Sequence, residues 1–156
     1  DLFVVGVGQG GSGINRGADH GFRIEFVKKM GYYTSIYRVG RGTRIMNVLD
    51  AITVLEAETI VKGENLEKTI KYVIASDLMS DVLLVDEEDM LLLTSLASDQ
   101  VLRTAQIVGA AGVIVVNGKS LPSSMMHVAR DLGMTLAVSK FSKFDACIAI
   151  HQYMTK

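Results

Sequence analysis

Residues 90–142 repeat one pattern of apolar and polar positions three times. Each repeat begins with a short apolar run, continues with a small polar turn and ends in a segment with the spacing of an amphipathic helix. The apolar runs occupy residues 90–94, 112–116 and 134–138. They are rich in Leu, Ile or Val and show no clear alternation, which is typical of strands buried on both faces.

The alternation of these strands with helices predicts the fold. The polar turns lie at residues 95–99, 117–122 and 139–142, and helices are expected over residues 100–108, 123–132 and 143–153. Strands that alternate with helices in this way form βαβ units and a parallel sheet. We therefore expect an α/β fold: a three-layer-like domain with a mostly parallel sheet built from repeated βα units, plus an N-terminal extension.

The segments before residue 90 are expected to add strands to this sheet or to pack against it. A short helix is expected over residues 46–52, strands over 54–61 and 70–76, and a second short helix from Asp77 through residue 84. Residues 86–89 are four consecutive acids, which could attract a divalent cation. A solvated loop is the favoured interpretation, because consecutive acids without glycine spacing do not wrap an ion.

The first 45 residues differ from the rest in charge. They carry seven Lys or Arg and three Asp or Glu, net +4, whereas residues 46–156 carry nine and fourteen, net −5, which together give the net charge of −1. We expect two parts: a glycine-rich segment over 1–45, which extends the fold, and an α/β domain over 46–156. In the first part, strands are expected at 2–5 and 32–39 and a helix at 23–30.

Three glycines near the beginning of the chain have the spacing of a dinucleotide-binding loop. Gly6, Gly8 and Gly11 fit G-x-G-x-x-G, in which the glycines allow phosphate to approach a helix N-terminus. The segment that follows contains Gly17 and Gly21, which disfavour the helix that this motif needs. A flexible loop is therefore the favoured interpretation, and a dinucleotide site is the alternative.

Composition narrows the classes of protein. With 49% apolar and 21% charged residues the chain is ordinary globular material. Its net charge of −1 gives no reason to expect nucleic acid or a membrane surface as a partner. The single cysteine, Cys147, cannot form an internal disulfide and is expected in the core of the last helix. No apolar run is long enough to span a bilayer, so a cytoplasmic location is expected.

Common catalytic motifs are incomplete. Gly118-Lys119-Ser120 resembles the end of a phosphate-binding P-loop, but Val113 stands where that pattern needs a glycine. His20, His127 and His151 lie at no spacing suited to a metal site, and His127 is expected at the surface. We therefore predict no catalytic residues, no metal site and no cofactor, and expect that the chain is not an enzyme by itself.

The pattern does predict a binding site at the carboxyl edge of the sheet, where open α/β sheets bind ligands. Hydroxyls, a turn amide, helix N-termini and two lysines suit an anionic or nucleotide-like ligand. The candidate ligand-binding residues are Thr94, Ser95, Ser98, Asp99, Asn117, Gly118, Lys119, Ser139 and Lys140. The favoured alternative is that Asp99 and Ser142 cap helices and Asn117-Gly118 forms a turn, since caps are needed in either case.

Four stretches carry a resemblance to a known family: residues 75–82, residues 93–105, residues 112–118 and residues 142–147. Over residues 46–153 they make the sequence similar to DRTGG-type domains, as found in the N-terminal part of HPr serine kinases and the middle of long phosphotransacetylases. Ala97-Ser98-Asp99 stands where the family has Asp-Arg-Thr, and Gly118-Lys119 stands where it has Gly-Gly. The resemblance implies a regulatory or dimerising α/β module.

The first 45 residues resemble the end of the Bergerat-fold ATPases, which include histidine kinases and anti-sigma-factor kinases. The matching pieces are residues 8–13, 26–30, 32–37 and 40–43. The function expected overall is a non-catalytic regulatory module that senses a small anionic or nucleotide-like metabolite. The alternative is an ATP-binding, kinase-like regulatory protein that uses the N-terminal glycine-rich segment.

The methionines bear on assembly. The chain has eight, and Met125, Met126, Met134 and Met154 could offer adaptable apolar surface for self-association. Filling the core is the alternative. The family resemblance favours a homodimer, and a partner protein is a further candidate.

Overall fold

The fold was taken from a computed structural model of the chain. It describes the backbone of residues 4–6, 23–29 and 32–38, and both backbone and side chains of residues 44–155. The glycine-rich stretch between residues 7 and 22, and with it most of the predicted dinucleotide-type motif, lies outside the described residues.

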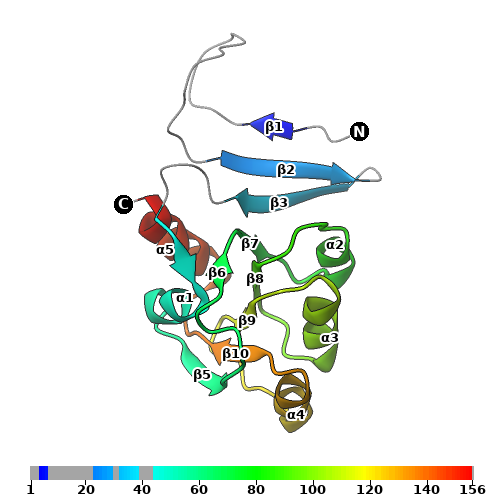
Figure 1. The fold of residues 1–156 in the computed structure, drawn as a ribbon, viewed down its shortest axis with the longest axis vertical. Helices are drawn as coiled ribbons and strands as arrows, with labels where there is room; N and C mark the ends of the chain where they lie inside the picture. Colours follow the sequence, from blue (N-terminus) through cyan, green and yellow to red (C-terminus); the bar gives the residue numbers. More distant parts are fainter. Residues whose placement is uncertain (1–3, 7–22, 30–31, 39–43, 156) are drawn as a thin grey trace.

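The main sheet has eight strands, which lie side by side in Figure 1. From one edge to the other they are β1 (Val4–Gly6), β2 (Arg23–Lys29), β3 (Tyr32–Arg38), β7 (Tyr72–Ala75), β8 (Met90–Thr94), β9 (Gly112–Val115), β10 (Thr135–Val138) and β5 (Glu58–Val61). The strands β7 to β10 are parallel, whereas β5 pairs with β10, and β3 with β7, antiparallel. Two short strands, β4 (Met46–Asn47) and β6 (Thr69–Ile70), form a separate pair.

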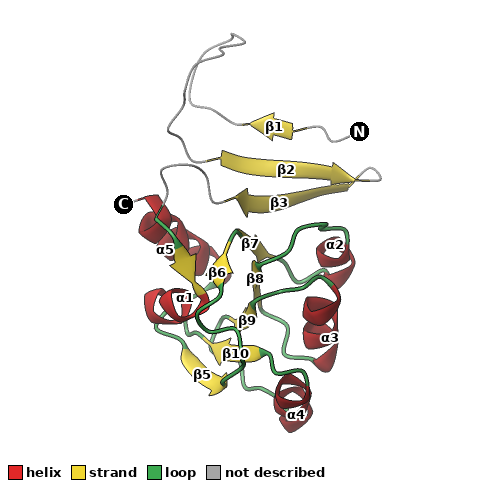
Figure 2. Ribbon diagram, viewed as in Figure 1, coloured by secondary structure: helices red, strands yellow, loops and turns green. Residues whose placement is uncertain are grey.

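The helices cover both faces of the parallel strands, as Figure 2 shows. One face carries α2 (Met79–Leu83), α3 (Asp99–Ile107) and α4 (Ser123–Asp131), and the other carries α1 (Val48–Val54) and α5 (Lys143–Thr155). Because β7, β8, β9 and β10 follow one another in both chain and sheet order, the three crossover helices fall on one face.

The strands supply side chains alternately to two cores. Leu92 packs with the helices α2, α3 and α4, whereas its neighbours Leu91 and Leu93 pack with α1 and α5. All five residues of β8 and all four of β9 are buried. Alternating apolar side chains that are all buried need a layer on each side, so the predicted α/β fold with three layers is confirmed.

The predicted helix over residues 23–30 is wrong, because this stretch forms the strand β2. It pairs with β3 over seven positions, from Arg23 opposite Arg38 to Lys29 opposite Tyr32. The β-branched and aromatic residues of β3 favour a pairing partner, whereas an isolated helix of this length is marginal in water. The strand predicted over 54–61 is also shorter than expected: Val54 still belongs to α1, and β5 begins at Glu58.

Several predictions about side-chain exposure change as well. Cys147 is exposed on α5, so its predicted place in the core is wrong. The opposite holds for the methionines: Met125, Met134 and Met154 are buried and Met126 is half-buried, so these four fill the core. Their side chains therefore offer little surface for self-association. His127 is exposed on α4, as predicted.

We predict that the turn after β5 requires glycine at residue 63. A Cβ atom at Gly63 would lie 2.4 Å from the carbonyl oxygen of Gly133 and 2.4 Å from the amide nitrogen of Thr135. Since backbone atoms cannot move aside cheaply, Gly63→Ala should lower the free energy of unfolding by about 1–3 kcal/mol. Urea titration would measure it. Gly112→Ala is the control, because its Cβ would meet a side-chain methyl of Val48 at 3.1 Å and no backbone atom closer than the Thr135 carbonyl oxygen at 3.6 Å. Equal losses in the two variants would contradict the prediction.

Candidate functional site

The loops after β8, β9 and β10 are held together at the carboxyl edge of the sheet by main-chain hydrogen bonds. The amide of Val116 donates to the carbonyl of Thr94 at 2.8 Å, and the amide of Ser139 donates to Val115 at 2.9 Å. The amide of Gly118 donates to the carbonyl of Ser139, also at 2.8 Å. Three polar turns that are far apart in the sequence therefore meet at one edge.

Asp77 is the centre of the strongest polar cluster at this edge. It lies two residues beyond β7, and one carboxylate oxygen accepts hydrogen bonds from the Thr94 hydroxyl at 2.9 Å and from the Ser95 amide at 2.7 Å. The other oxygen accepts from the Ser95 hydroxyl and forms an ion pair with Lys143, the first residue of α5. We call Asp77, Thr94, Ser95 and Lys143 the Asp77 cluster.

The environment of Asp77 keeps its carboxylate charged. Partial burial raises its pKa, but the hydrogen bonds from the Lys143 ammonium, from the hydroxyl and amide of Ser95 and from the Thr94 hydroxyl outweigh burial and hold the pKa well below its usual value of 3.8. The Asp77 side chain is 38% exposed and that of Lys143 is 29% exposed. The pair is therefore accessible to solvent while it connects the end of β7 with the beginning of α5.

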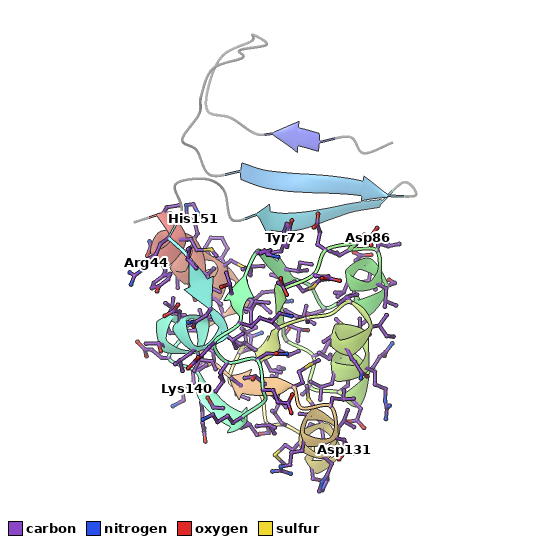
Figure 3. The ribbon with its side chains drawn as sticks, viewed as in Figure 1. Arg44, Tyr72, Asp86, Asp131, Lys140 and His151 are labelled. Carbon is purple, nitrogen blue, oxygen red and sulfur yellow. The ribbon has the colours of Figure 1, made fainter. Side chains whose placement is uncertain are left out.

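A second group of candidate residues surrounds the turn after β9. Asn117 and Gly118 have positive φ values of 66° and 58°, which confirms the predicted turn. Both residues are exposed, as are Lys119 and Lys140. A Cβ atom on Gly118 would lie 3.8 Å from the Cγ atom of Lys140, so the loops that carry the two lysines are adjacent. Figure 3 shows Lys140 beside β10.

Two of the predicted binding residues are buried and form hydrogen bonds inside the protein. Thr94 is fully buried, and its hydroxyl donates to Asp77 and accepts from the amide of Leu96 at 3.2 Å. Ser139 is also fully buried, and its hydroxyl donates to the Leu55 carbonyl at 2.6 Å and accepts from the Phe141 amide. These two hydroxyls hold the loops in place from below the surface.

The helix N-termini at this edge differ in charge. Ser98 is the N-cap residue of α3 without a side-chain cap bond, and Asp99 accepts a hydrogen bond from Ser124 of α4 at 2.9 Å rather than capping α3. Ser142 accepts a hydrogen bond from the amide of Asp145, as the predicted cap does. The first turns of α3 and α5 each contain an acid, whereas that of α4 contains none. The carboxylate of Asp99, which accepts from Ser124 in the first turn of α4, offsets the partial positive charge there, so the exposed Lys119 and Lys140 are the stronger source of positive charge at this edge.

The sequence pattern predicts that the three turns meet at one edge, as they do, but it does not predict the contact of Asp77 with Lys143. It predicts Asp77 only as a helix start and Lys143 only as part of a helix. The strand rule could have included Asp77, because it follows β7 as Ser95 follows β8. No sequence signal identifies Lys143, since its contact depends on how α5 crosses to the other face of the sheet.

The opposite, amino edge of the sheet carries a hollow of about 690 Å³. Its lining includes Tyr72, Leu83, Glu88 and Ile107, from the beginning of β7 and the ends of α2 and α3. Figure 3 shows Tyr72 beside β7 and Asp86 beside α2. The acidic residues predicted as a loop do form one, and Asp89 in it is paired with Lys68 at 2.7 Å and Lys71 at 2.8 Å.

The described residues contain neither a cluster of metal-ligating side chains nor a membrane-spanning helix. Among them, no group of three or more His, Cys, Asp or Glu side chains is arranged to hold a metal ion. None of the helices formed by these residues is long and apolar enough to cross a bilayer.

Comparisons with known proteins found a similar fold among solved structures. No protein-family model matches the sequence, and no curated protein matches it. Among solved structures, the chain is similar to the CBS and DRTGG domains of the regulatory region of Clostridium perfringens pyrophosphatase, in complex with its activator diadenosine tetraphosphate. The TM-score is 0.56 at 16% sequence identity, over 67% of this chain and 45% of that chain.

The matching two-thirds of the chain share the fold of part of that regulatory region. At this identity the match shows the fold alone, and it spans less than half of the pyrophosphatase chain. The predicted resemblance to a DRTGG-type domain is thus confirmed as a likeness of fold. The resemblance of residues 1–45 to Bergerat-fold ATPases stays a prediction, as does the domain boundary near residue 45.

We predict that Asp77 makes stability depend on pH in the acid range. Since its pKa is lowered on folding, its contribution is complete above pH 3.8 and is lost as the pH falls below that value. Thermal unfolding followed by circular dichroism should show Asp77→Asn less stable by roughly 1 kcal/mol at neutral pH, because solvent screens this exposed pair. The gap between variant and wild type should close in acid. Asp131→Asn, at an exposed carboxylate of α4, is the control, and a gap that stays constant below pH 3.8 would contradict the assignment.

Proposed function

We propose that the chain is a non-catalytic regulatory module that binds a small anionic or nucleotide-like metabolite at the carboxyl edge of its sheet. The observation that carries the proposal is the convergence of the loops after β8, β9 and β10, fixed by the bonds from Val116, Gly118 and Ser139. Open α/β sheets bind ligands at this edge, because the polar loops and the helix N-termini gather there.

The charge at the edge favours an anion at the turns that carry Lys119 and Lys140. Both lysines are exposed, and they lie on adjacent loops. Lys143 is already paired with Asp77, so it contributes less to an incoming ligand. Of the predicted residues, Asn117, Gly118, Lys119 and Lys140 form the proposed contact surface, while Thr94, Ser139 and Asp99 support it.

The similar solved structure supports a regulatory role. That regulatory region of the pyrophosphatase was determined with an activator that carries four phosphates between two adenosines. A module of the same fold that responds to a phosphorylated metabolite is consistent with the charge found here. We propose no reaction for the chain by itself.

We predict that the two exposed lysines carry anion affinity. Isothermal titration with ATP should show binding that weakens about thirtyfold in the double variant Lys119→Ala/Lys140→Ala, since two charge-assisted contacts of roughly 1 kcal/mol each at an exposed site add to about 2 kcal/mol. Lys62→Ala is the matched control, because Lys62 is exposed and follows β5 at the other end of β10. Equal losses in the control, or binding that depends on the hollow residue Ile107, would contradict a site at the carboxyl edge. ATP binding that resists the double variant but is lost in Gly10→Ala would favour the alternative, a site in the glycine-rich segment.

We also propose that the module forms a homodimer, with a partner protein as the other candidate. The described surface exposes several large apolar side chains, among them Ile45 at 71% and Leu49 at 48%. A self-complementary interface would bury side chains of this kind at its centre.

Sedimentation tests the dimer. We expect a species of twice the mass of one chain at micromolar concentration, and we expect Met126→Ala to leave it intact because the methionines fill the core. A monomer that persists as the concentration rises would show that the proposed dimer is wrong.

A further inference from the structure

Each of three members of the Asp77 cluster is followed in the chain by an exposed large apolar residue. Leu78 follows Asp77 and is 57% exposed, Leu96 follows Ser95 and is 37% exposed, and Phe144 follows Lys143 and is 73% exposed. Since Asp77 touches both Ser95 and Lys143, these apolar residues come from three separate loops and helix starts and lie one residue away from a common centre.

Their local positions do not explain the exposure. Leu78 occupies the N-cap position of α2, where a polar side chain is preferred, and it makes no side-chain cap bond. Phe144 lies in the first turn of α5, a helix that buries Ala146, Ile150 and Met154 against the sheet while Phe144 stays outside. Single exposed apolar residues are common, but a group around one polar cluster is typical of a binding surface.

The two lysines and the exposed apolar residues lie a short distance apart along the edge of the sheet. Lys119 follows β9 and Lys140 follows β10, whereas Ser95 follows β8 and Asp77 follows β7. Neighbouring strands lie about 4.8 Å apart, so the lysine turns and the Asp77 cluster are separated by roughly 10 Å along the edge. Inorganic phosphate cannot reach across this distance, whereas a nucleoside triphosphate can.

We propose that the ligand is a nucleotide whose base packs on the apolar side chains of Leu78, Leu96 and Phe144 while its phosphates contact Lys119 and Lys140. This inference rests on the proposed function and adds the class of ligand. Phe144 supplies an aromatic face, on which any nucleobase can stack. The Asp77 carboxylate and the Ser95 hydroxyl lie at the centre of the three apolar residues, where they can accept from or donate to a ribose hydroxyl.

Two probes separate this inference from the proposed function. Calorimetric titration of the full chain with ATP and with tripolyphosphate compares a ligand that has a base with one that has charge alone. We expect ATP to bind at least tenfold more tightly than tripolyphosphate. Phe144→Ala should weaken ATP binding about tenfold, as expected for loss of one stacked base, and should leave tripolyphosphate binding unchanged.

The matched control is Ile107→Ala, because Ile107 is also 73% exposed but lies in the hollow at the amino edge. It should change neither affinity. Equal binding of both probes, unaffected by Phe144→Ala, would overturn the nucleotide inference and leave an anion site standing. Binding of neither probe at millimolar concentration would overturn the proposed function as well. If Phe144→Ala changes only the sedimentation of the protein, the apolar surface belongs to a second copy of the chain and the inference is wrong.

Discussion

The burial of the parallel strands on both faces is the constraint on which the rest of the structure depends. Every residue of β8 and β9 is buried, so each strand sends side chains into two separate cores. One layer of helices cannot cover such a sheet. The crossover helices α2, α3 and α4 fill one side, and α1 and α5, from the two ends of the fully described region, fill the other.

This two-sided arrangement explains the position of the Asp77 cluster. After β10 the chain crosses to the other face of the sheet, because α5 packs on the face opposite to the crossover helices. Lys143, the first residue of α5, lies at this crossing. Its ion pair with Asp77 connects the layer of α5 with the end of β7, two strands removed from β9. A polar contact at the rim thus adds to the apolar contact that β7 and α5 already share through Val73 and Ala146 in one core.

The sequence predicted most accurately where local pattern and tertiary burial agree. The strand β8 matches its apolar run from Met90 to Thr94, and α3 and α4 match their segments within one residue. The pattern failed where a partner decides the outcome: β2 is a strand because β3 pairs with it along its length. The candidate site shows the same difference between features set by local sequence and features set by long-range packing. The turn at Asn117-Gly118 could be predicted from local chemistry, whereas the contact between Asp77 and Lys143 depends on long-range packing.

The turn after β9 also determines how an anion could be held. In P-loops the backbone amides of a glycine-rich turn point at the phosphate. Here the amide of Asn117 donates to Phe141 and that of Gly118 donates to Ser139, so both are already used to join β9 to the loop after β10. An anion at this edge would meet mobile ammonium groups rather than these two fixed amides. Ammonium groups at an exposed surface are screened within about 8 Å at physiological ionic strength. Occupancy of such a site would therefore follow the ionic conditions around the protein as well as the concentration of the metabolite.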